Sequence, residues 1–471
     1  MGKHHHMSRR KFLGTASCAA IGTTTFYSTL FNLGMANAAA GRTAKYNLNP
    51  ANNNYKALVC ILLAGGNDSF NMLVPTDNSA YNAYATTRSN LALAQNSLLG
   101  LTPTSGNQVP LGLHPAMPEV QQLFNTGDLA FVSNIGTLVE PTTLTQYNNG
   151  SANLPLGLFS HADQIQQWQT SVPNNRSAQG WGGRMADILQ AMNNNQNISM
   201  SISLSGRNVF QSGNSTAEYT IRNQGTGSIG ITGYGESNVL DQLRTQAVDN
   251  LMEQQYNDIF KKTYADVVSN AQDTHEIFSA AVGGVNLTTQ FAQSELSQSL
   301  QMIARTIAAR NSLNVCRQTF FVTFGGWDHH DELTNNQNAM LGVVSQALND
   351  FNNVMNELGV SNDVTTFTIS DFGRTLTSNG NGTDHAWGGN VMVMGGSVNG
   401  GQVYGTYPDL ALNSSLDVGN GVLIPTLSTD EYFAELARWF GVTDTDLLTI
   451  FPNLLNFYTP SSSPPIGFMR V

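Results

Sequence analysis

Three acidic residues, widely separated along the chain, each stand directly after a short apolar run or a few residues beyond it. They are Asp68, Asp328 and Asp371, which follow the runs 57–63, 319–324 and 365–370. Carboxylates gathered at one place repel one another unless a cation lies between them. If the fold brings the ends of these runs together, the acids predict a metal site whose ligands come from distant parts of the sequence.

Histidines near two of these acids offer nitrogen ligands. Asp328 and His330 are two positions apart, so on an extended segment their side chains point the same way and can hold one ion. His385, one loop after Asp371, would complete that set, and nitrogen with carboxylate suits zinc or a similar transition metal. Asp68 and Asp371 would offer oxygen to a second, harder ion such as calcium, magnesium or manganese.

Each motif also has a structural interpretation. Taken alone, Gly-Gly-Asn-Asp or Trp-Asp-His-His is commonly a turn with a capping acid, because Gly and Asp are frequent in turns. Three such segments together with a histidine loop favour the metal site.

The elements that would position these residues follow a βαβ rhythm. Continuous apolar runs too short for a helix predict strands buried on both faces of a parallel sheet. Strands are expected at 57–63, 129–133, 319–324, 365–370 and 390–394, and helices at 115–126, 161–170, 180–190, 238–280 with a possible break, 288–310, 336–358 and 430–440. We therefore expect an α/β fold with a doubly wound, mostly parallel sheet and helices on both faces. In such folds ligands bind at the carboxyl ends of the strands, where the three acids would meet.

Two other parts of the chain differ in character. Residues 39–55 are rich in Asn and lack periodicity, so we expect an extended leader. In residues 191–236, clusters of Asn and Gly separate short alternating segments, which predicts a small antiparallel β insertion. The expected organisation is one domain over 56–459 that contains this insertion, followed by a tail at 460–471.

The N-terminus predicts export. The first six residues resemble a short histidine tag, and the adjacent arginines Arg9 and Arg10 then open a basic region. A weakly apolar stretch to Met35 and the small residues at 36–38 complete the layout of a twin-arginine signal. Gly, Thr and Asn interrupt that stretch, which makes it a poor membrane-spanning helix. We expect removal of residues 1–38, a periplasmic or secreted protein, and no stable membrane insertion afterwards.

The charge of the chain excludes one class of partner. Without residues 1–38, 17 basic residues stand against 32 acidic ones. A surface this acidic repels phosphate backbones, so we expect no nucleic-acid binding.

A nucleophile is the least specific of the predictions. Ser160 opens the helix expected at 161–170, where the positive helix end and a nearby metal would ease formation of an alkoxide. The same position suits a serine that only caps the helix, and the sequence favours neither interpretation. Ser69 is a weaker candidate because it adjoins Asp68.

Arg374 is the second catalytic candidate. Its guanidinium could bind two oxygens of an anionic ester at once. A salt bridge to Asp371 or Asp384 is an equally good interpretation. His161 and His114 are expected to be structural histidines.

Taken in order, the motifs resemble those of an exported bacterial family catalogued as domain of unknown function 1501. The resemblance covers nearly the whole chain after the signal. It is carried by Gly65-Gly66-Asn67-Asp68, Ser160-His161, Gly180-Trp181, Gly326-Trp327-Asp328-His329-His330, Ser370-Asp371-Phe372-Gly373-Arg374-Thr375 and Asp384-His385-Ala386-Trp387. That family is grouped with the alkaline phosphatase and sulfatase superfamily, so the resemblance implies enzymes that hydrolyse or transfer phosphate and sulfate esters.

The resemblance also implies a ligand set. Its members are Asp68, Asp328, His330, Asp371 and His385. Members with two zinc ions place a histidine directly after the acid that matches Asp371, whereas this chain has Phe372. The second metal site would therefore be built from oxygen alone, occupied differently, or absent.

The sequence thus leads to one functional hypothesis and its alternatives. The hypothesis is an exported metallohydrolase that cleaves a small anionic phosphate or sulfate ester with metal-activated Ser160 or water. The alternative is a metal-stabilised binding protein of the cell envelope that keeps the fold while its catalytic set has decayed. A scaffold for a second exported protein is a further alternative.

Overall fold

The computed structural model describes residues 55–104 and 109–470. The predicted signal and nearly all of the predicted leader lie outside these residues. Among the described residues, Gly230–Ile277 form one compact unit and the remainder form a second, larger one. The larger unit carries the sheet and the predicted site.

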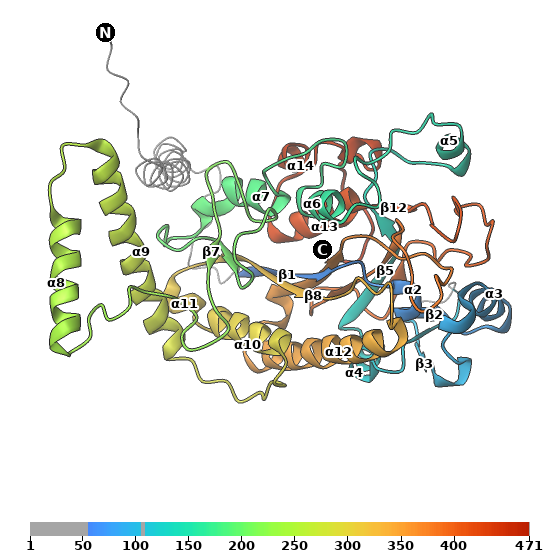
Figure 1. The fold of residues 1–471 in the computed structure, drawn as a ribbon, viewed down its shortest axis with the longest axis horizontal. Helices are drawn as coiled ribbons and strands as arrows, with labels where there is room; N and C mark the ends of the chain where they lie inside the picture. The colour runs from blue at the N-terminus through green and yellow to red at the C-terminus, as the bar shows by residue number, and fades with distance from the viewer. Residues whose placement is uncertain (1–54, 105–108, 471) are drawn as a thin grey trace, which may run out of the picture. The chain divides into compact units, whose positions relative to one another are not determined.

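A mixed, mostly parallel sheet forms the centre of the larger unit (Figure 1). Within the described residues it has nine strands, which are β1 (Lys56–Ala64), β5 (Leu129–Gly136), β6 (Ser201–Ser203), β7 (Tyr219–Thr220), β8 (Arg317–Gly325), β9 (Val364–Ser370), β10 (Gly389–Met394), β11 (Val403–Tyr404) and β12 (Leu427–Ser428). Their order is β11-β5-β10-β9-β1-β8-β6-β7, and β12 also pairs with β5. Strand β10 is antiparallel to its neighbours β5 and β9, and the other pairs in this sheet are parallel. The predicted fold class is confirmed.

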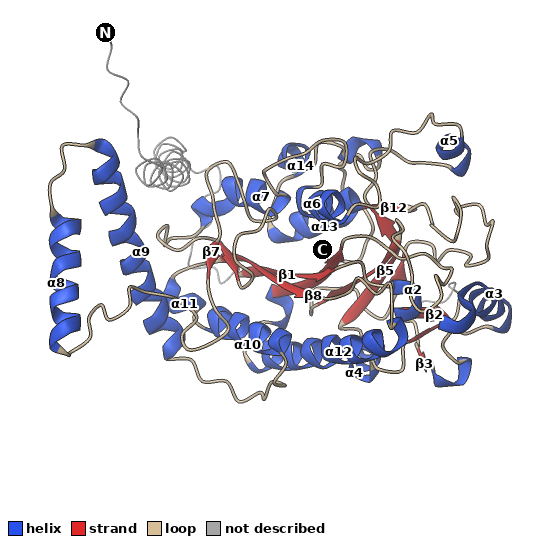
Figure 2. Ribbon diagram, in the orientation of Figure 1, coloured by secondary structure: helices blue, strands red, loops and turns tan. Residues whose placement is uncertain are grey.

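Helices cover both faces of this sheet (Figure 2). One face packs against α4 (Pro118–Thr126), α10 (Glu295–Ala308) and α12 (Leu333–Glu357), and the other against helices that include α6 (His161–Thr170), α7 (Trp181–Leu189), α13 (Thr429–Phe440) and α14 (Asp444–Ile450). The central strand β1 shows why. Its alternate residues point to opposite faces, so Val59 and Ile61 join the first core, while Leu58, Cys60 and Leu62 join the second.

Local signals place the helix ends close to the predicted boundaries. Helix α6 starts after Ser160, whose side chain accepts a hydrogen bond from a backbone N–H of the first turn. In α13, Ser428 and Glu431 form a capping box. Helix α4 has Pro118 in its first turn and ends at Gly127, which adopts the left-handed conformation at φ 84°.

The small antiparallel sheet lies elsewhere than predicted. It consists of β2 (Leu73–Pro75), β3 (Leu99–Gly100) and β4 (Leu111–Leu113). The segment 191–236 instead contributes β6 and β7, which extend the main sheet in parallel beyond β8. That part of the prediction was wrong, because a short alternating segment fits either strand direction and only the neighbouring strand decides between them.

The region predicted as one interrupted helix over 238–280 forms two, α8 (Val239–Glu253) and α9 (Ile259–Gly283). The remaining helices are short, apart from α3. They are α2 (Ser69–Met72), α3 (Asn78–Arg88), α5 (Leu144–Asn148) and α11 (Arg310–Leu313). Among the described residues, no helix combines the length and apolar character needed to cross a membrane.

Candidate metal centre

The sheet brings the predicted acids to one edge. Strands β8 and β9 flank β1 in parallel, so Leu63 lies opposite both Phe324 and Ser370. The three strands therefore end at the same edge of the sheet. Because β10 runs the other way, the loop that precedes it, which carries His385, lies at the same edge. The close approach requires Gly65, where a Cβ would lie 2.4 Å from the backbone nitrogen of Asp328.

Three side chains from three elements converge there. His161 at the start of α6, Asp328 after β8 and His385 before β10 offer ligand atoms that all lie within 4.8 Å of one another. The Nε2 atoms of His161 and His385 are 3.0 Å apart. The Asp328 carboxylate oxygens lie 3.5 Å from His161 Nε2 and 3.4 Å from His385 Nε2. Ligands about 2.1 Å from a tetrahedral zinc ion lie about 3.4 Å from one another, so these spacings fit one zinc ion.

His330 adjoins this group on its exposed side. Its Nε2 lies 3.0 Å from Asp328 Oδ1 and 3.0 Å from His385 Nε2. Asp328 and His330 therefore come together as their spacing predicted. We call His161, Asp328, His330 and His385 the histidine cluster.

The other ring nitrogen of each histidine in the cluster has an oxygen partner. These partners are Asp371 Oδ2 for His161 (2.6 Å), the Phe159 carbonyl for His385 (2.8 Å) and Asp384 Oδ1 for His330 (3.1 Å). A carbonyl or carboxylate oxygen accepts, so each Nδ1 donates and each Nε2 presents a lone pair to the cluster. Three lone pairs and a carboxylate that face one another form a donor set that fits a zinc ion.

The charges nearby favour the ligand forms of these groups. Burial lowers the pKa of His385 below its ordinary value, which keeps the imidazole neutral. Burial alone would raise the pKa of Asp328, but the hydrogen bond and charge of Arg374 lower it below its ordinary value. Metal binding requires neutral imidazole and ionised carboxylate, so both shifts favour it.

Arg374 lies behind the cluster and is fully buried. It donates to the carbonyls of Gly65 (2.7 Å), Gly66 (3.0 Å) and Thr383 (3.0 Å), and it forms an ion pair with Asp328. Each of its three nitrogens is engaged, and its acidic partner differs from the two that the sequence suggested. The structure therefore does not offer Arg374 to an ester oxygen. Instead, the guanidinium ties together the loops after β1 and β8 and the loop before β10.

Asp68 and Asp371 do not meet in an oxygen-only site. Asp68 is buried and pairs with Arg88, with Oδ2 2.6 Å from a guanidinium nitrogen. Asp371 supports His161 from behind, and its other oxygen accepts from the backbone N–H of Gly65 (3.0 Å). Burial raises the pKa of Asp371, and the bonds from Gly65 and His161 oppose that rise. Each acid thus already has a positively polarised partner.

Phe372 occupies the place where the two-zinc pattern has a histidine. Its buried ring packs against the rings of His161 and His385, with centroids 4.8 and 4.6 Å away. It offers no atom to a metal ion, but it packs against two histidine rings of the cluster.

Ser160 directly precedes His161 in the chain and therefore lies near the histidine cluster. Its Oγ accepts a long hydrogen bond of 3.5 Å from the N–H of Asp163, as a capping serine does. The weaker candidate Ser69 is buried, and its Oγ accepts from the N–H of Asn390 at 2.7 Å. Ser69 therefore joins α2 to β10.

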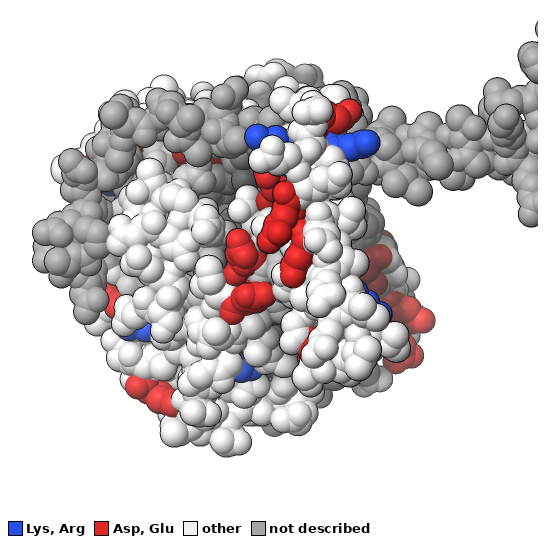
Figure 3. All heavy atoms as spheres, turned by 90° about the vertical axis from the view of Figure 1, so that its left-hand side faces the viewer, with Lys and Arg blue, Asp and Glu red and all other residues white. Residues whose placement is uncertain are grey.

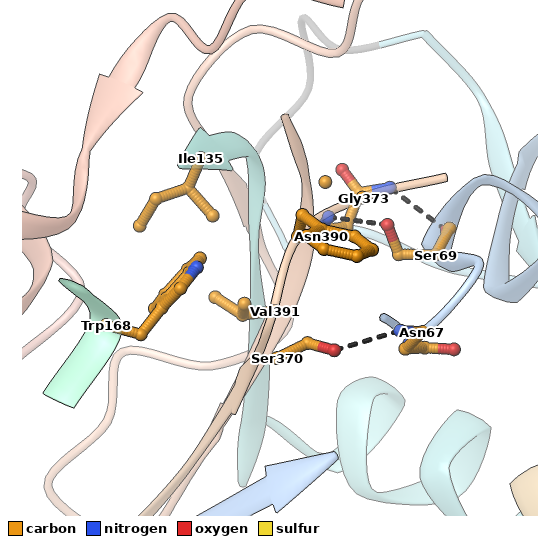
Figure 4. Close-up of a pocket in the computed structure, with 10 residues that line it drawn as sticks. Asn67, Ser69, Ile135, Trp168, Ser370, Gly373, Asn390 and Val391 are labelled. Atoms are coloured by element: carbon orange, nitrogen blue, oxygen red, sulfur yellow. Dashed lines mark hydrogen bonds between the residues drawn. The ribbon is translucent and has the colours of Figure 1, made fainter. Parts of the chain in front are cut away.

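A small pocket lies beside Phe372 and is lined by residues that include members of β5, α6, β9 and β10 (Figure 4). Figure 4 shows Trp168 of α6 facing Val391, and Ser370 Oγ accepting from the N–H of Asn67 (2.9 Å). The pocket is too narrow for an ester substrate.

His161 is the member of the histidine cluster that the sequence reasoning missed. It was expected to be structural, because nothing in its spacing links it to Asp328 or His385. One usable signal was its position, directly after a capping serine at the first residue of a helix. His114, by contrast, is structural as predicted: it is buried, its Nδ1 accepts from the N–H of Ala116, and burial lowers its pKa to about 4.

Comparisons with known proteins give one family and several distant structures. No curated protein matches the chain. A sulfatase from Pseudoalteromonas sp. is similar at 11% identity over 83% of this chain and 68% of that chain, with a TM-score of 0.33. The soluble domain of a lipooligosaccharide phosphoethanolamine transferase from Neisseria meningitidis is similar at 9% identity over 85% and 90%, with a TM-score of 0.29. We base no functional statement on similarity at this level.

The match to a family extends over most of the chain. The family's sequence model covers residues 55–449, from the start of β1 almost to the end of α14, and so includes every residue of the histidine cluster. The chain belongs to the family described as protein of unknown function (DUF1501).

Proposed function

We propose that the protein is an exported metal-dependent hydrolase of phosphate or sulfate esters. The observation that carries the proposal is the convergence of three imidazole Nε2 atoms on the Asp328 carboxylate, with every Nδ1 held by an oxygen. Buried structural histidines have no need of this arrangement, whereas metal ligands use it regularly.

His161, Asp328 and His385 would hold the ion, with His330 at its exposed side. Bound zinc would act as a Lewis acid and lower the pKa of bound water. The side chains of Asp328 and His330 are 46% and 43% exposed, so a substrate can approach the cluster from solvent. Asp371, Asp384 and Arg374 keep the ligands in place rather than touching the substrate.

Ser160 remains the proposed nucleophile, with water as its rival. Its long capping bond leaves the hydroxyl weakly engaged, and it immediately precedes His161. The dipole of α6 favours negative charge at this helix end.

The alternative is a metal-stabilised binding protein or a scaffold for a second exported protein. Two observations favour it: Phe372 replaces a ligand of the two-zinc pattern, and Arg374 has no nitrogen left for an anionic substrate. A single metal site is sufficient to stabilise a fold. Without a free guanidinium to bind the anionic ester, it offers few groups for ester cleavage.

Metal analysis combined with turnover of aryl phosphate and aryl sulfate tests the proposal. Purified protein should contain about one zinc ion per chain, and Asp328→Asn and His385→Gln should lose it, whereas the exposed neighbour Asp331→Asn should keep it. Full metal content in the first two variants would refute the metal site. Bound metal without turnover of either ester would favour the binding protein. Turnover that Ser160→Ala leaves unchanged would show that the serine is not the nucleophile.

Export is tested separately. Replacing Arg9 and Arg10 by lysine should keep the full-length chain in the cytoplasm, whereas the unchanged chain should appear in the periplasm or medium in a shortened form. Equal export of both chains would exclude the twin-arginine route.

A further inference from the structure

Helix α8 in the smaller unit differs from an ordinary surface helix, because its apolar side faces solvent and its polar side contacts the rest of the unit. Its polar row consists of Asp241, Thr245 and Asp249, spaced four residues apart and therefore on one side of the helix. The chain's own preceding loop covers that row: Tyr234 Oη donates to Asp249 (2.6 Å), and the N–H of Gly235 donates to Thr245 Oγ1 (2.9 Å). The side of α8 that the protein itself uses is therefore the polar one.

The opposite side of α8 carries an apolar row that faces solvent. We call Leu240, Leu243, Ala247 and Leu251 the α8 stripe, and their spacing of three, four and four residues places them on one face, roughly opposite the polar row. The three leucines are 75%, 57% and 60% exposed. None of the residues of α8 is buried. Scattered exposed leucines are ordinary, but a continuous row of them marks a binding surface.

The spacing of the stripe indicates what shape would cover it. Apolar residues repeated every three or four residues form one face of a helix, along which a second helix packs. An extended segment would instead need contacts every second residue. The occupant is therefore a helix with an apolar row of its own.

Charge decides between the possible sources of that helix. The smaller unit, Gly230–Ile277, holds eight acidic residues against three basic ones. Figure 3, which views the molecule from the α8 side, shows acidic side chains gathered on this face. A second copy would bring two acidic surfaces together, and an anionic membrane would repel the same surface. A helix with Lys or Arg beside its apolar row would instead be attracted.

We propose that the α8 stripe is a docking site for an amphipathic helix with basic flanks, supplied by another protein. The leucines of the stripe bind the apolar row of that helix, and the net acidic charge of the smaller unit attracts its basic flanks. This site is formed by a different unit from the histidine cluster, so its function does not depend on ester cleavage.

The test uses synthetic helical peptides of about three heptads as probes. One peptide has Leu at the seam and Lys beside it, a second has the same composition in shuffled order, and a third has Glu in place of Lys. The protein is the full chain, compared with Leu243→Gln/Leu251→Gln and with the matched control Leu455→Gln, whose leucine is 58% exposed outside the smaller unit. Circular dichroism and zinc content of the variants verify that the fold is intact.

The Leu/Lys peptide should bind the unchanged chain and the control, and more weakly as salt rises to about 0.15 M. Binding to the double variant should weaken roughly 10-fold or more. Equal binding of the shuffled or the Glu peptide, or unchanged binding to the double variant, would overturn the proposal. So would a dimer of the unchanged chain in sedimentation that the double variant abolishes, because the occupant would then be a second copy.

Discussion

Replacing Asp371 by Asn tests whether the supporting carboxylates fix the chemistry of the histidine cluster. Asp371 accepts two hydrogen bonds at once, from His161 Nδ1 (2.6 Å) and from the N–H of Gly65 (3.0 Å). An amide of the same shape has one oxygen to accept with, and its nitrogen donates. Whichever way the introduced amide turns, either Gly65 loses its acceptor or His161 faces a donor.

The second outcome forces His161 into the other tautomer, with its proton on Nε2. That nitrogen then points a hydrogen, rather than a lone pair, at Asp328 and His385. Loss of such a supporting carboxylate weakens metal binding by roughly 10- to 100-fold, or about 1.4–2.8 kcal/mol. The metal-free protein should lose little stability, because the substitution removes a buried carboxylate whose pKa is raised by burial.

The assay is competition for zinc against a chromogenic chelator, combined with urea unfolding of the metal-free protein. Asp350→Asn is the matched control, since Asp350 is also buried and accepts two hydrogen bonds, from Ala292 N (3.0 Å) and Gln346 Nε2 (2.7 Å), but contacts no histidine of the cluster. Zinc affinity within about twofold of the unchanged protein in Asp371→Asn would refute the tautomer argument. An equal loss of affinity in the control would also refute it.

Three further predictions concern stability. Removing zinc with a chelator should lower the melting temperature, by an amount that corresponds to about 2.7 kcal/mol when zinc had been present at about 100 times its Kd, and zinc but not magnesium should restore it in calorimetry. Arg374→Met should cost about 3–5 kcal/mol in urea unfolding, because it leaves Asp328 and three backbone carbonyls without their partner, and Lys should not rescue it; a loss below about 1 kcal/mol would contradict the role given to the guanidinium. Burial raises the pKa of Asp430 from 3.8 to about 7, so the native state keeps a proton that the unfolded chain has lost, and stability should fall as pH rises between these values by up to about 1.4 kcal/mol per pH unit. Asp430→Asn should flatten that dependence, and an unchanged pH profile of the unfolding free energy would argue against the shift.

The comparison of sequence and structure shows which features are local. The apolar runs that became β1, β8 and β9 need no distant partner to be recognised, because a short continuous run fits a strand buried on both faces. Asp328 and His330 could be paired from their spacing alone, and the structure keeps them 3.0 Å apart. Helix α6 could be placed from its capping serine.

Competition between distant groups decided the rest. Asp68, Asp371 and Asp328 look alike in the sequence, since each follows an apolar run. In the fold, Asp68 pairs with Arg88, and Asp371 bonds to Nδ1 of His161. Of the three acids, only Asp328 faces the Nε2 atoms of the cluster. The spacing of these residues along the chain does not predict which partner each acid has.

The sequence by itself therefore determined the five longest strands of the main sheet, most of the helices, and the edge of the sheet at which the acids lie. The tertiary structure alone decided that β10 runs against its neighbours and so brings His385 to that edge. It also decided that the start of α6 adds His161, and that every nitrogen of Arg374 is engaged in joining three loops. The physical reason is that strand and helix patterns are set by neighbours along the chain. A metal site, in contrast, is set by which lone pairs remain free after every nearby donor has found its acceptor.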